Sequence, residues 1–217
     1  MASRIKTLIF DLDGTLVDTS QDITEAINYA IEPYGLNHIT VEETIGLVGE
    51  GITRLIEKVL KDKIQCRDEA IKRFLGYYSR NLTRHSMPYE GVKETLEGLG
   101  RYRKVVVSNK REALSRRLLE ELCLDVYFDY ILGSDSTSEK KPSPVPILKA
   151  LELTIATPEE ALMIGDSNLD IQAGHSAGVK TVAVLYGYRS YEMLKDADYF
   201  IRENMSEIID ILKALEE

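Results

Sequence analysis

Cysteine is scarce in this chain: only two of its 217 residues are cysteines. Tryptophan is absent. Cys66 and Cys123 lie too far apart in the sequence to form the closely spaced pairs that are typical of zinc sites and redox motifs. Two cysteines in a chain of this length also argue against a disulfide framework. We therefore expect structural or surface thiols in a reducing compartment, and no catalytic cysteine.

Basic residues are also few: 27 Lys and Arg stand against 36 Asp and Glu, for a net charge of −9. Because nucleic-acid phosphates are bound by clustered positive charge, this balance argues against a uniform nucleic-acid-binding surface. No stretch reaches the ~18 consecutive apolar residues of a membrane span, and the opening MASRIKTLIF lacks the apolar run of a signal peptide. We expect a cytoplasmic protein that binds neither nucleic acid nor membranes.

The chain does contain enough apolar residues, 44%, to bury a substantial core. They fall into short runs that predict six strands: Lys6–Phe10, Lys104–Val107, Tyr130–Leu132, Ala161–Ile164, Thr181–Leu185 and a weaker Tyr199–Ile201. Helical patterns lie between most of these runs, at Val92–Leu99, Ala113–Leu122, Pro146–Leu151, Asp170–Ala177 and Ser206–Leu215. The alternation predicts an α/β fold in which helices cover both faces of a parallel sheet.

One interval breaks the alternation. Between Val17 and Arg84 the pattern is helical and contains no good strand, with one helix beginning near Ile23 and capped by Ser20 or Thr19. We expect an all-helical insertion, residues 17–84, between the first strand and the remainder of a core formed by residues 1–16 and 85–217. Its hinges should lie near residues 16–19 and 84–89.

Polar residues follow four of the predicted strands. Three sets come directly after a strand, and one lies in the loop beyond the third strand. In open parallel sheets ligands bind outside the carboxyl ends of the strands, so these residues should gather at one edge. The residues are Asp11, Asp13, Gly14 and Thr15, then Ser108, Asn109 and Lys110, then Lys140 and Lys141, and finally Gly165, Asp166, Ser167 and Asp170. Any one of them alone is more typical of a helix cap or a turn, but the set together predicts an active site.

The segments DLDGTLVD, VVSN, KPSP and GDSNLD, in this order, resemble the four motifs of the haloacid dehalogenase-like superfamily. The resemblance spans the chain, because the helical insertion lies where that family has its helical cap. It implies a Rossmann-like core with the cap inserted after the first strand. LVGEGITRLIEKVL, PYEGVKETLEGL, GDSNLDIQAGHSAGVKTVAVLYGYRS and DADYFI further resemble bacterial phosphoglycolate phosphatases.

The resemblance assigns roles to the acidic residues. It implies that Asp11 is the nucleophile that forms an aspartyl phosphate, and that Asp13 is the general acid–base. It also implies a magnesium ion held by the side chains of Asp11 and Asp166 and the backbone carbonyl of Asp13. Two residues apart in a regular strand, Asp11 and Asp13 would share one face. Dehalogenases, phosphonate hydrolases and transport ATPases of the superfamily lack an aspartate at the second place, so Asp13 favours ester hydrolysis or phosphomutation.

Ser108 and the backbone of Asn109 would hold the phosphate oxygens, and Lys141 would offset negative charge on the nucleophile and the phosphate. Lys140 is the rival lysine. Asp170, four residues after Asp166, could share a helix face with it and would support the site or serve as a further metal-site residue.

The loop GEG, formed by Gly49, Glu50 and Gly51, resembles the cap loop that faces the active site in the family, although a plain helix–helix turn is the alternative. Arg54 is the nearest cap cation and could meet a substrate carboxylate, but it also fits a solvated helix face. The histidines show no ligand spacing and receive no catalytic role. Asp18 we interpret as a local cap or hinge residue.

The sequence therefore favours a magnesium-dependent phosphomonoester hydrolase, with 2-phosphoglycolate as the expected substrate. A sugar phosphomutase of the β-phosphoglucomutase type and a phosphatase for another small phosphate ester or pyrophosphate are the alternatives. A non-enzymatic phospho-aspartate receiver fits less well, because receivers lack the inserted helices and do not need Asp13. The expected partner is a small phosphorylated metabolite, and the expected state is a monomer or homodimer.

Overall fold

The computed structural model describes residues 4–216. Its centre is a parallel sheet of six strands in the order β5-β4-β1-β6-β7-β8. The strands are β1 (Thr7–Phe10), β4 (Arg103–Val107), β5 (Tyr130–Leu132), β6 (Ala161–Gly165), β7 (Lys180–Val184) and β8 (Tyr199–Ile201). All six predicted strands are confirmed, with small shifts at their ends.

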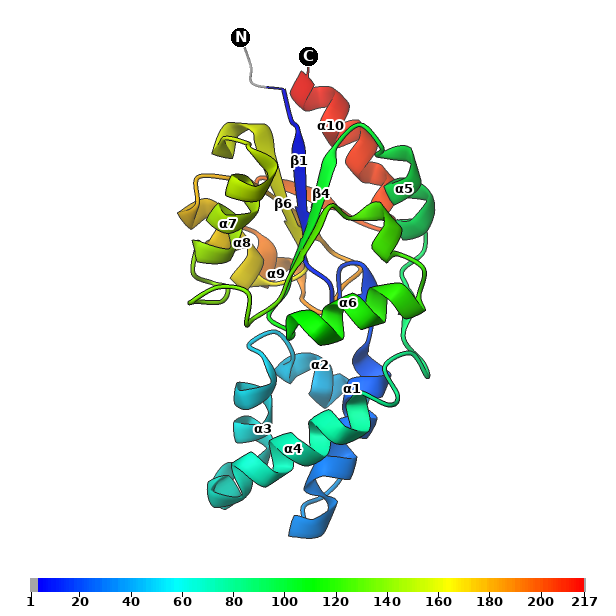
Figure 1. Cartoon of the computed structure of the whole chain (residues 1–217), viewed down its shortest axis with the longest axis vertical. Helices are drawn as coiled ribbons and strands as arrows, with labels where there is room; N and C mark the ends of the chain where they lie inside the picture. Colours follow the sequence, from blue (N-terminus) through cyan, green and yellow to red (C-terminus); the bar gives the residue numbers. More distant parts are fainter. Residues whose placement is uncertain (1–3, 217) are drawn as a thin grey trace.

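Side chains on β1 alternate between the two faces of the sheet, as a strand buried on both sides requires. Leu8 and Phe10 belong to one buried cluster and Ile9 to another. The first cluster includes residues of α5 (Val92–Gly98), α6 (Glu112–Glu121) and α10 (Ile208–Glu216), and the second includes residues of α7 (Val145–Thr154) and α8 (Asn168–Ser176). Figure 1 shows α7 and α8 on one side of the sheet and α5 and α10 on the other. The predicted α/β class is confirmed.

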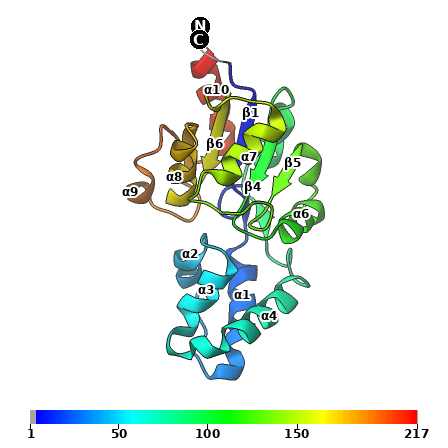
Figure 2. The ribbon, with the colours of Figure 1, turned by 60° about the vertical axis from the view of Figure 1, so that its left-hand side comes forward.

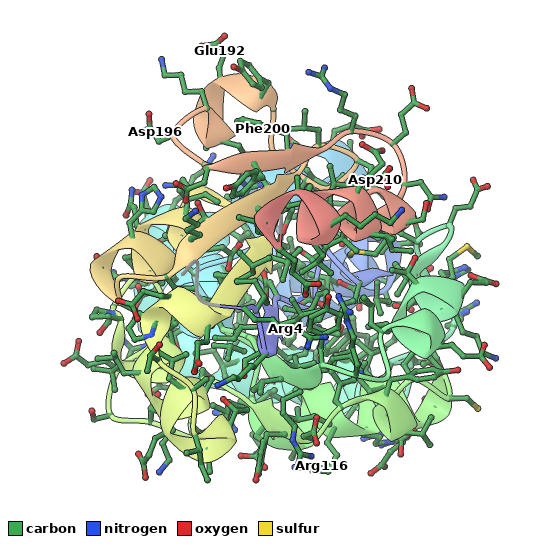
Figure 3. The ribbon with its side chains drawn as sticks, turned by 90° about the horizontal axis from the view of Figure 1, so that it is seen from above. Arg4, Arg116, Glu192, Asp196, Phe200 and Asp210 are labelled. Carbon is green, nitrogen blue, oxygen red and sulfur yellow. The ribbon has the colours of Figure 1, made fainter. Side chains whose placement is uncertain are left out.

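The short helix α9 (Tyr191–Leu194) precedes β8 at the outer edge of the sheet. Figure 3, seen from the end opposite the inserted helices, shows Glu192 of α9 pointing away from the core. Phe200 of β8 instead packs against a small buried cluster that includes Ala183 and Leu194. Five 3₁₀ turns complete the described elements: η1 (Glu32–Tyr34), η2 (Lys61–Cys66), η3 (Asp125–Tyr127), η4 (Pro158–Glu160) and η5 (Met205–Glu207). No helix within residues 4–216 is both long enough and apolar enough to span a membrane.

The inserted segment forms four α-helices that lie together at one end of the core (Figures 1 and 2). They are α1 (Ser20–Ile31), α2 (Val41–Leu47), α3 (Ile52–Leu60) and α4 (Arg67–Tyr78). Ile27 of α1, Ile56 of α3 and Phe74 of α4 bury their side chains in the small core between these helices. We refer to this group of helices as the cap. The domain division at residues 17–84 stays a prediction, but the helices do fall inside it.

The expectation that residues 17–84 contain no strand is wrong at its first two residues. Val17–Asp18 form β2, which pairs antiparallel with β3 (Met87–Pro88), so the chain segments entering and leaving the cap run side by side. Strands of two residues are too short to show any hydrophobic periodicity, which is why the sequence pattern missed them. They lie within the two predicted hinge regions.

The start of α1 also differs from the expectation. Thr19 occupies the N-cap position, but its side chain makes no capping hydrogen bond. Instead, Oδ1 of Asp18 accepts hydrogen bonds from the backbone N–H and the hydroxyl of Ser20, at 3.0 and 2.7 Å. Asp18 therefore acts locally at the start of the helix, as we had interpreted it.

Asp22 ties α1 to the chain segment that leaves the cap. Its buried carboxylate accepts hydrogen bonds from the backbone N–H of His85, and from both the backbone N–H and the hydroxyl of Ser86. Charge-assisted bonds of this kind are stronger than neutral ones.

Replacing Asp22 by alanine should lower the free energy of unfolding by about 2–4 kcal/mol, because buried N–H groups lose their charged acceptor. Chemical denaturation monitored by circular dichroism measures this change. Asp68→Ala is the control, since the Asp68 side chain on α4 is 86% exposed and its loss should cost less than about 0.5 kcal/mol. Equal effects of the two substitutions would contradict the role of Asp22.

Candidate active site

A cavity lies where the carboxyl ends of β1, β4 and β6 face the cap. The core contributes Asp11, Asp13, Ser108, Asn109, Lys110, Asp166, Tyr188 and Arg189 to its walls, and the cap contributes Gly49, Gly51, Ile52, Leu55, Phe74 and Tyr78, among others. Its volume is about 80 Å³. The predicted convergence at one sheet edge thus brings residues from three strand ends together with cap residues.

Asp11 and Asp13 both lie just beyond the end of β1, not within the strand, so the strand-face argument for their spacing does not apply. Asp11 is buried, and its Oδ1 lies 2.9 Å from Nζ of Lys141. Within residues 4–216 this oxygen receives no well-oriented hydrogen bond. Burial, with smaller contributions from Asp170 and Asp13, outweighs the attraction of Lys141 and raises the pKa of Asp11 to about 7.

Asp166 follows β6 and is held by groups from two other loops. Its Oδ1 accepts a hydrogen bond from the Thr15 hydroxyl at 3.2 Å, and its Oδ2 accepts one from the backbone N–H of Tyr188 at 2.9 Å. Burial, together with the nearby charges of Asp11 and Asp170, raises the pKa of Asp166 well above its ordinary value.

Two glycines make this close approach of loops possible. At Gly14, whose φ is +85°, a Cβ atom would lie 2.3 Å from Oδ2 of Asp166. At Gly187 a Cβ atom would lie 2.3 Å from the backbone oxygen of Gly14 and 2.4 Å from Cβ of Asp166. Any larger residue at either position would push Asp166 away from Asp11.

Carboxylate oxygens of Asp11, Asp166 and Asp170 lie within 4.8 Å of one another, which fits a hard divalent cation such as magnesium. Both oxygens of Asp170 are already engaged. Oδ1 accepts from Nζ of Lys141 at 2.6 Å, and Oδ2 accepts from the backbone N–H and hydroxyl of Ser167 at 3.0 and 2.6 Å. Asp170 thus accepts three hydrogen bonds, whereas Asp166 accepts two and Oδ1 of Asp11 accepts none with good geometry. Asp11 and Asp166 therefore have more lone pairs left for a metal than Asp170 has.

The suggestion that Asp166 and Asp170 share a helix face is wrong. Asp166 precedes α8, whereas Asp170 lies in its first turn and forms a capping box with Ser167. Asp170 instead reaches the site through Lys141, which it orients.

Lys141 is the buried cation of the site, with 2% of its side chain exposed. Its ammonium group contacts Asp11 and Asp170 and donates a hydrogen bond to the backbone oxygen of Val107 at 2.6 Å. Burial alone would lower the pKa of Lys141, but the two carboxylates outweigh it and raise the pKa to about 12. Lys140, the rival, donates to the backbone oxygen of Glu50 in an exposed position.

Asp13 is oriented by two neighbours. Its Oδ1 accepts a hydrogen bond from the Thr19 hydroxyl at 2.7 Å and forms an ion pair with Lys110. Lys110 in turn donates to the Tyr78 hydroxyl of the cap at 2.9 Å. Burial raises the pKa of Tyr78 to about 12, against the opposing charge of Lys110. Sequence reasoning placed Lys110 at this edge but gave it no role, since its partner Tyr78 lies on α4.

The predicted phosphate-binding residues Ser108 and Asn109 line the same cavity as Asp11 and Asp13. Ser108 is buried, and its hydroxyl accepts a hydrogen bond from the backbone N–H of Lys110 at 3.2 Å. The side-chain amide of Asn109 donates to the backbone oxygens of Gly49 and Lys141, at 2.8 and 2.9 Å. Asn109 thus links the cap loop to the loop that carries Lys141.

The Gly49–Gly51 loop connects α2 to α3 and also faces the cavity, so both of its interpretations apply. Both glycines have positive φ, +123° and +82°. The side chain of Glu50 forms an ion pair with Lys58, and that of Arg54 is exposed and pairs with Glu57. Neither side chain is among those that line the cavity in this structure.

Arg189, in the loop between β7 and α9, is a cavity residue that sequence reasoning missed. Its guanidinium donates to the backbone oxygens of Ile45 and Val48 at the end of α2, both at 2.5 Å. The motif comparison included this arginine only within a longer matching segment, and nothing in the sequence indicated that it reaches the cap.

Comparison with known proteins shows what this chain is similar to. Residues 8–184 match the family model for haloacid dehalogenase-like hydrolases. A phosphoglycolate phosphatase of Aquifex aeolicus is 42% identical over 85% of this chain and 86% of its own. A protein of Caldanaerobacter subterraneus, named as a candidate pyrophosphatase, is 38% identical over 99% of this chain and 97% of its own. A crystal structure described as a predicted phosphoglycolate phosphatase from Haemophilus somnus superposes with a TM-score of 0.89 and 30% identity, covering 97% and 99% of the two chains.

Magnesium should stabilise the protein more at pH 8 than at pH 6. The pKa of Asp11 is raised on folding to about 7, so without metal the carboxyl is mostly protonated at pH 6 and a cation must displace that proton. At pH 8 the ionised carboxylate attracts the cation directly. The change in Tm on adding magnesium chloride, measured by differential scanning fluorimetry, tests this.

Asp11→Asn is the matched control, since an amide does not titrate in this range. In that variant the magnesium-induced shift should be small at both pH values. A shift in the wild-type protein that is equal at pH 6 and pH 8 would contradict the raised pKa.

Proposed function

Since the chain belongs to the haloacid dehalogenase-like hydrolases, we propose that it is a magnesium-dependent phosphomonoester hydrolase that forms an aspartyl phosphate on Asp11. The observation that carries this proposal is that two carboxylates at the cavity, those of Asp11 and Asp13, lie in different surroundings. Asp11 lies against Lys141 with one oxygen free of hydrogen bonds, whereas Asp13 is held by Thr19 and Lys110. Different surroundings are what a nucleophile and an acid–base require.

In the first step a carboxylate oxygen of Asp11 attacks phosphorus, and the bond from phosphorus to the ester oxygen breaks. Asp13 gives its proton to the departing alcohol. In the second step Asp13 takes a proton from water, whose oxygen attacks the aspartyl phosphate. Inorganic phosphate leaves and Asp11 is regenerated.

The remaining residues manage charge and position. A magnesium ion held by Asp11 and Asp166 would reduce the repulsion between Asp11 and the incoming phosphate. Ser108 and the backbone of Asn109 would bind phosphate oxygens, and the ammonium of Lys141 would align Asp11 and favour its ionised form against the effect of burial. Asp170 holds Lys141 in place, so its role is positional. Gly49 and Gly51 of the cap loop would let backbone approach the substrate closely.

We infer 2-phosphoglycolate as the substrate, a small phosphorylated metabolite. The names of the Aquifex and Haemophilus proteins support it. Arg54, exposed on the cap, keeps at most a secondary place in this proposal.

Pyrophosphate is the second candidate substrate, favoured by the name of the Caldanaerobacter protein. It too is small and carries a second anionic group.

A cytoplasmic location and a monomeric or homodimeric state also stay predictions.

A phosphate-release assay across substrates tests the reaction and the substrate together. With magnesium, 2-phosphoglycolate should be hydrolysed with a higher kcat/KM than pyrophosphate or sugar phosphates, and chelation should abolish release. Glucose 1-phosphate should not be converted to the 6-phosphate. A flat, weak profile would remove the phosphoglycolate assignment and leave the reaction class standing.

Asp11→Asn should reduce kcat by about 10⁴-fold or more, because the nucleophile is lost. Asp18→Asn is the control at a nearby carboxylate. Its amide oxygen can still accept the Ser20 hydrogen bonds, so activity should stay within about tenfold, the value of one ordinary hydrogen bond. Magnesium-dependent turnover by purified Asp11→Asn protein would rule out the mechanism.

A further inference from the structure

Arg189 brings a positive charge from the core to the cap side of the cavity. Its two hydrogen bonds reach backbone oxygens of Ile45 and Val48, which belong to the carboxyl end of α2. Carbonyls at the end of a helix lack partners within the helix, so an arginine satisfies them well. These contacts satisfy two of the five N–H groups of the guanidinium and leave three.

The charge of Arg189 is not matched by these contacts. Among residues 4–216 Arg189 forms no ion pair within 4.0 Å, although Asp166 lies near enough for the charge of Arg189 to oppose the rise in the pKa of Asp166. The side chain is half-buried, so water compensates its charge only in part. A half-buried cation beside a cavity that contacts no carboxylate attracts an anion from the ligand.

The other cations around the cavity either form an ion pair or are exposed to solvent. Lys110 forms an ion pair with Asp13, and Lys141 forms ion pairs with Asp11 and Asp170. Arg111 also lines the cavity, but it is exposed, and solvent screens its charge. Arg189 is therefore the cavity cation best placed to bind a further negative charge.

Its neighbours place Arg189 close to the phosphate side. The backbone N–H of the preceding residue, Tyr188, binds Asp166. A Cβ atom built on Gly49 would lie 3.8 Å from a guanidinium nitrogen of Arg189, and the backbone oxygen of Gly49 accepts a hydrogen bond from Asn109. A small molecule bound by its phosphate near Asp11 and Asn109 would thus extend toward Arg189.

We propose that Arg189 binds a second anionic group of the substrate, a carboxylate or a second phosphate, and so selects small phosphate esters that carry one. This inference rests on the proposed phosphatase function and deepens it. The guanidinium would hold the anion with its free N–H groups while remaining bonded to α2. Arg189 would then bind the anionic group of the substrate and, through α2, hold the cap next to the core.

The test compares 2-phosphoglycolate with its amide, 2-phosphoglycolamide, in which the second negative charge is absent. In Arg189→Gln protein, kcat/KM for 2-phosphoglycolate should fall about 10- to 100-fold, the range expected for loss of charged hydrogen bonds. For the amide it should fall by a clearly smaller factor, which reports only the lost hydrogen bonds to α2, because that substrate offers Arg189 no anion. Arg189→Lys should recover part of the loss.

Arg117→Gln is the matched control. Arg117 lies on α6 in the core and donates to the backbone oxygen of Ser79 at the end of α4, so it joins core and cap without lining the cavity. The ratio of the two kcat/KM values should be unchanged in this variant. An equal loss on both substrates in Arg189→Gln would show that Arg189 only fastens the cap, and would overturn the proposal.

A binding measurement separates this proposal from the proposed function. Calorimetric titration of Asp11→Asn protein with 2-phosphoglycolate measures binding without turnover. In the double variant, which carries both Asp11→Asn and Arg189→Gln, binding of 2-phosphoglycolate should be weaker by a factor similar to the loss in kcat/KM. Unchanged binding would overturn the role of Arg189, whatever the wild-type activity. Failure of the wild-type protein to release phosphate from any ester would instead overturn the reaction class.

Discussion

The structure depends on holding like charges together out of water at the end of β1. Asp11, Asp166 and Asp170 bring carboxylate oxygens within 4.8 Å of one another, and Lys141 supplies an ammonium that contacts two of them. One cation does not balance three carboxylates, so the residual charge must be met by protons or by a divalent ion. Close packing at Gly14 and Gly187 maintains the arrangement by keeping the loops from spreading. The proposed affinity for a metal and for phosphate would follow from the same constraint.

Much of the fold could be predicted from the sequence because a parallel sheet buried on both faces leaves a strong pattern. Runs such as Lys104–Val107 and Ala161–Ile164 are almost wholly apolar and too short for helices. The placement of Asp11, Asp166 and Lys141 followed from topology, since the ends of adjacent parallel strands meet at one edge. Motif resemblance then supplied roles that composition alone could not. Those roles stay proposals, whereas the proximity of the three residues is observed.

What the sequence did not predict depends on contacts between distant segments. Lys110 could not be assigned because one of its partners, Tyr78, lies on a cap helix, and Arg189 could not because its partners are backbone oxygens of α2. Backbone groups leave no trace in residue identity, so such contacts are invisible to motif reasoning. The shared-face interpretation of Asp166 and Asp170 failed for a local reason: the helix begins between them, at Asn168.

The β2–β3 ribbon has a mechanical consequence. A domain attached by a single strand can rotate freely about it, but the cap is attached by two strands that are hydrogen-bonded to each other at Val17–Asp18 and Met87–Pro88. Such a double strap resists torsion far more than it resists bending. Any movement of the cap relative to the core would have to bend both strands together, which would favour rocking over free rotation and would keep Tyr78 and the Gly49–Gly51 loop aligned with the same edge of the sheet.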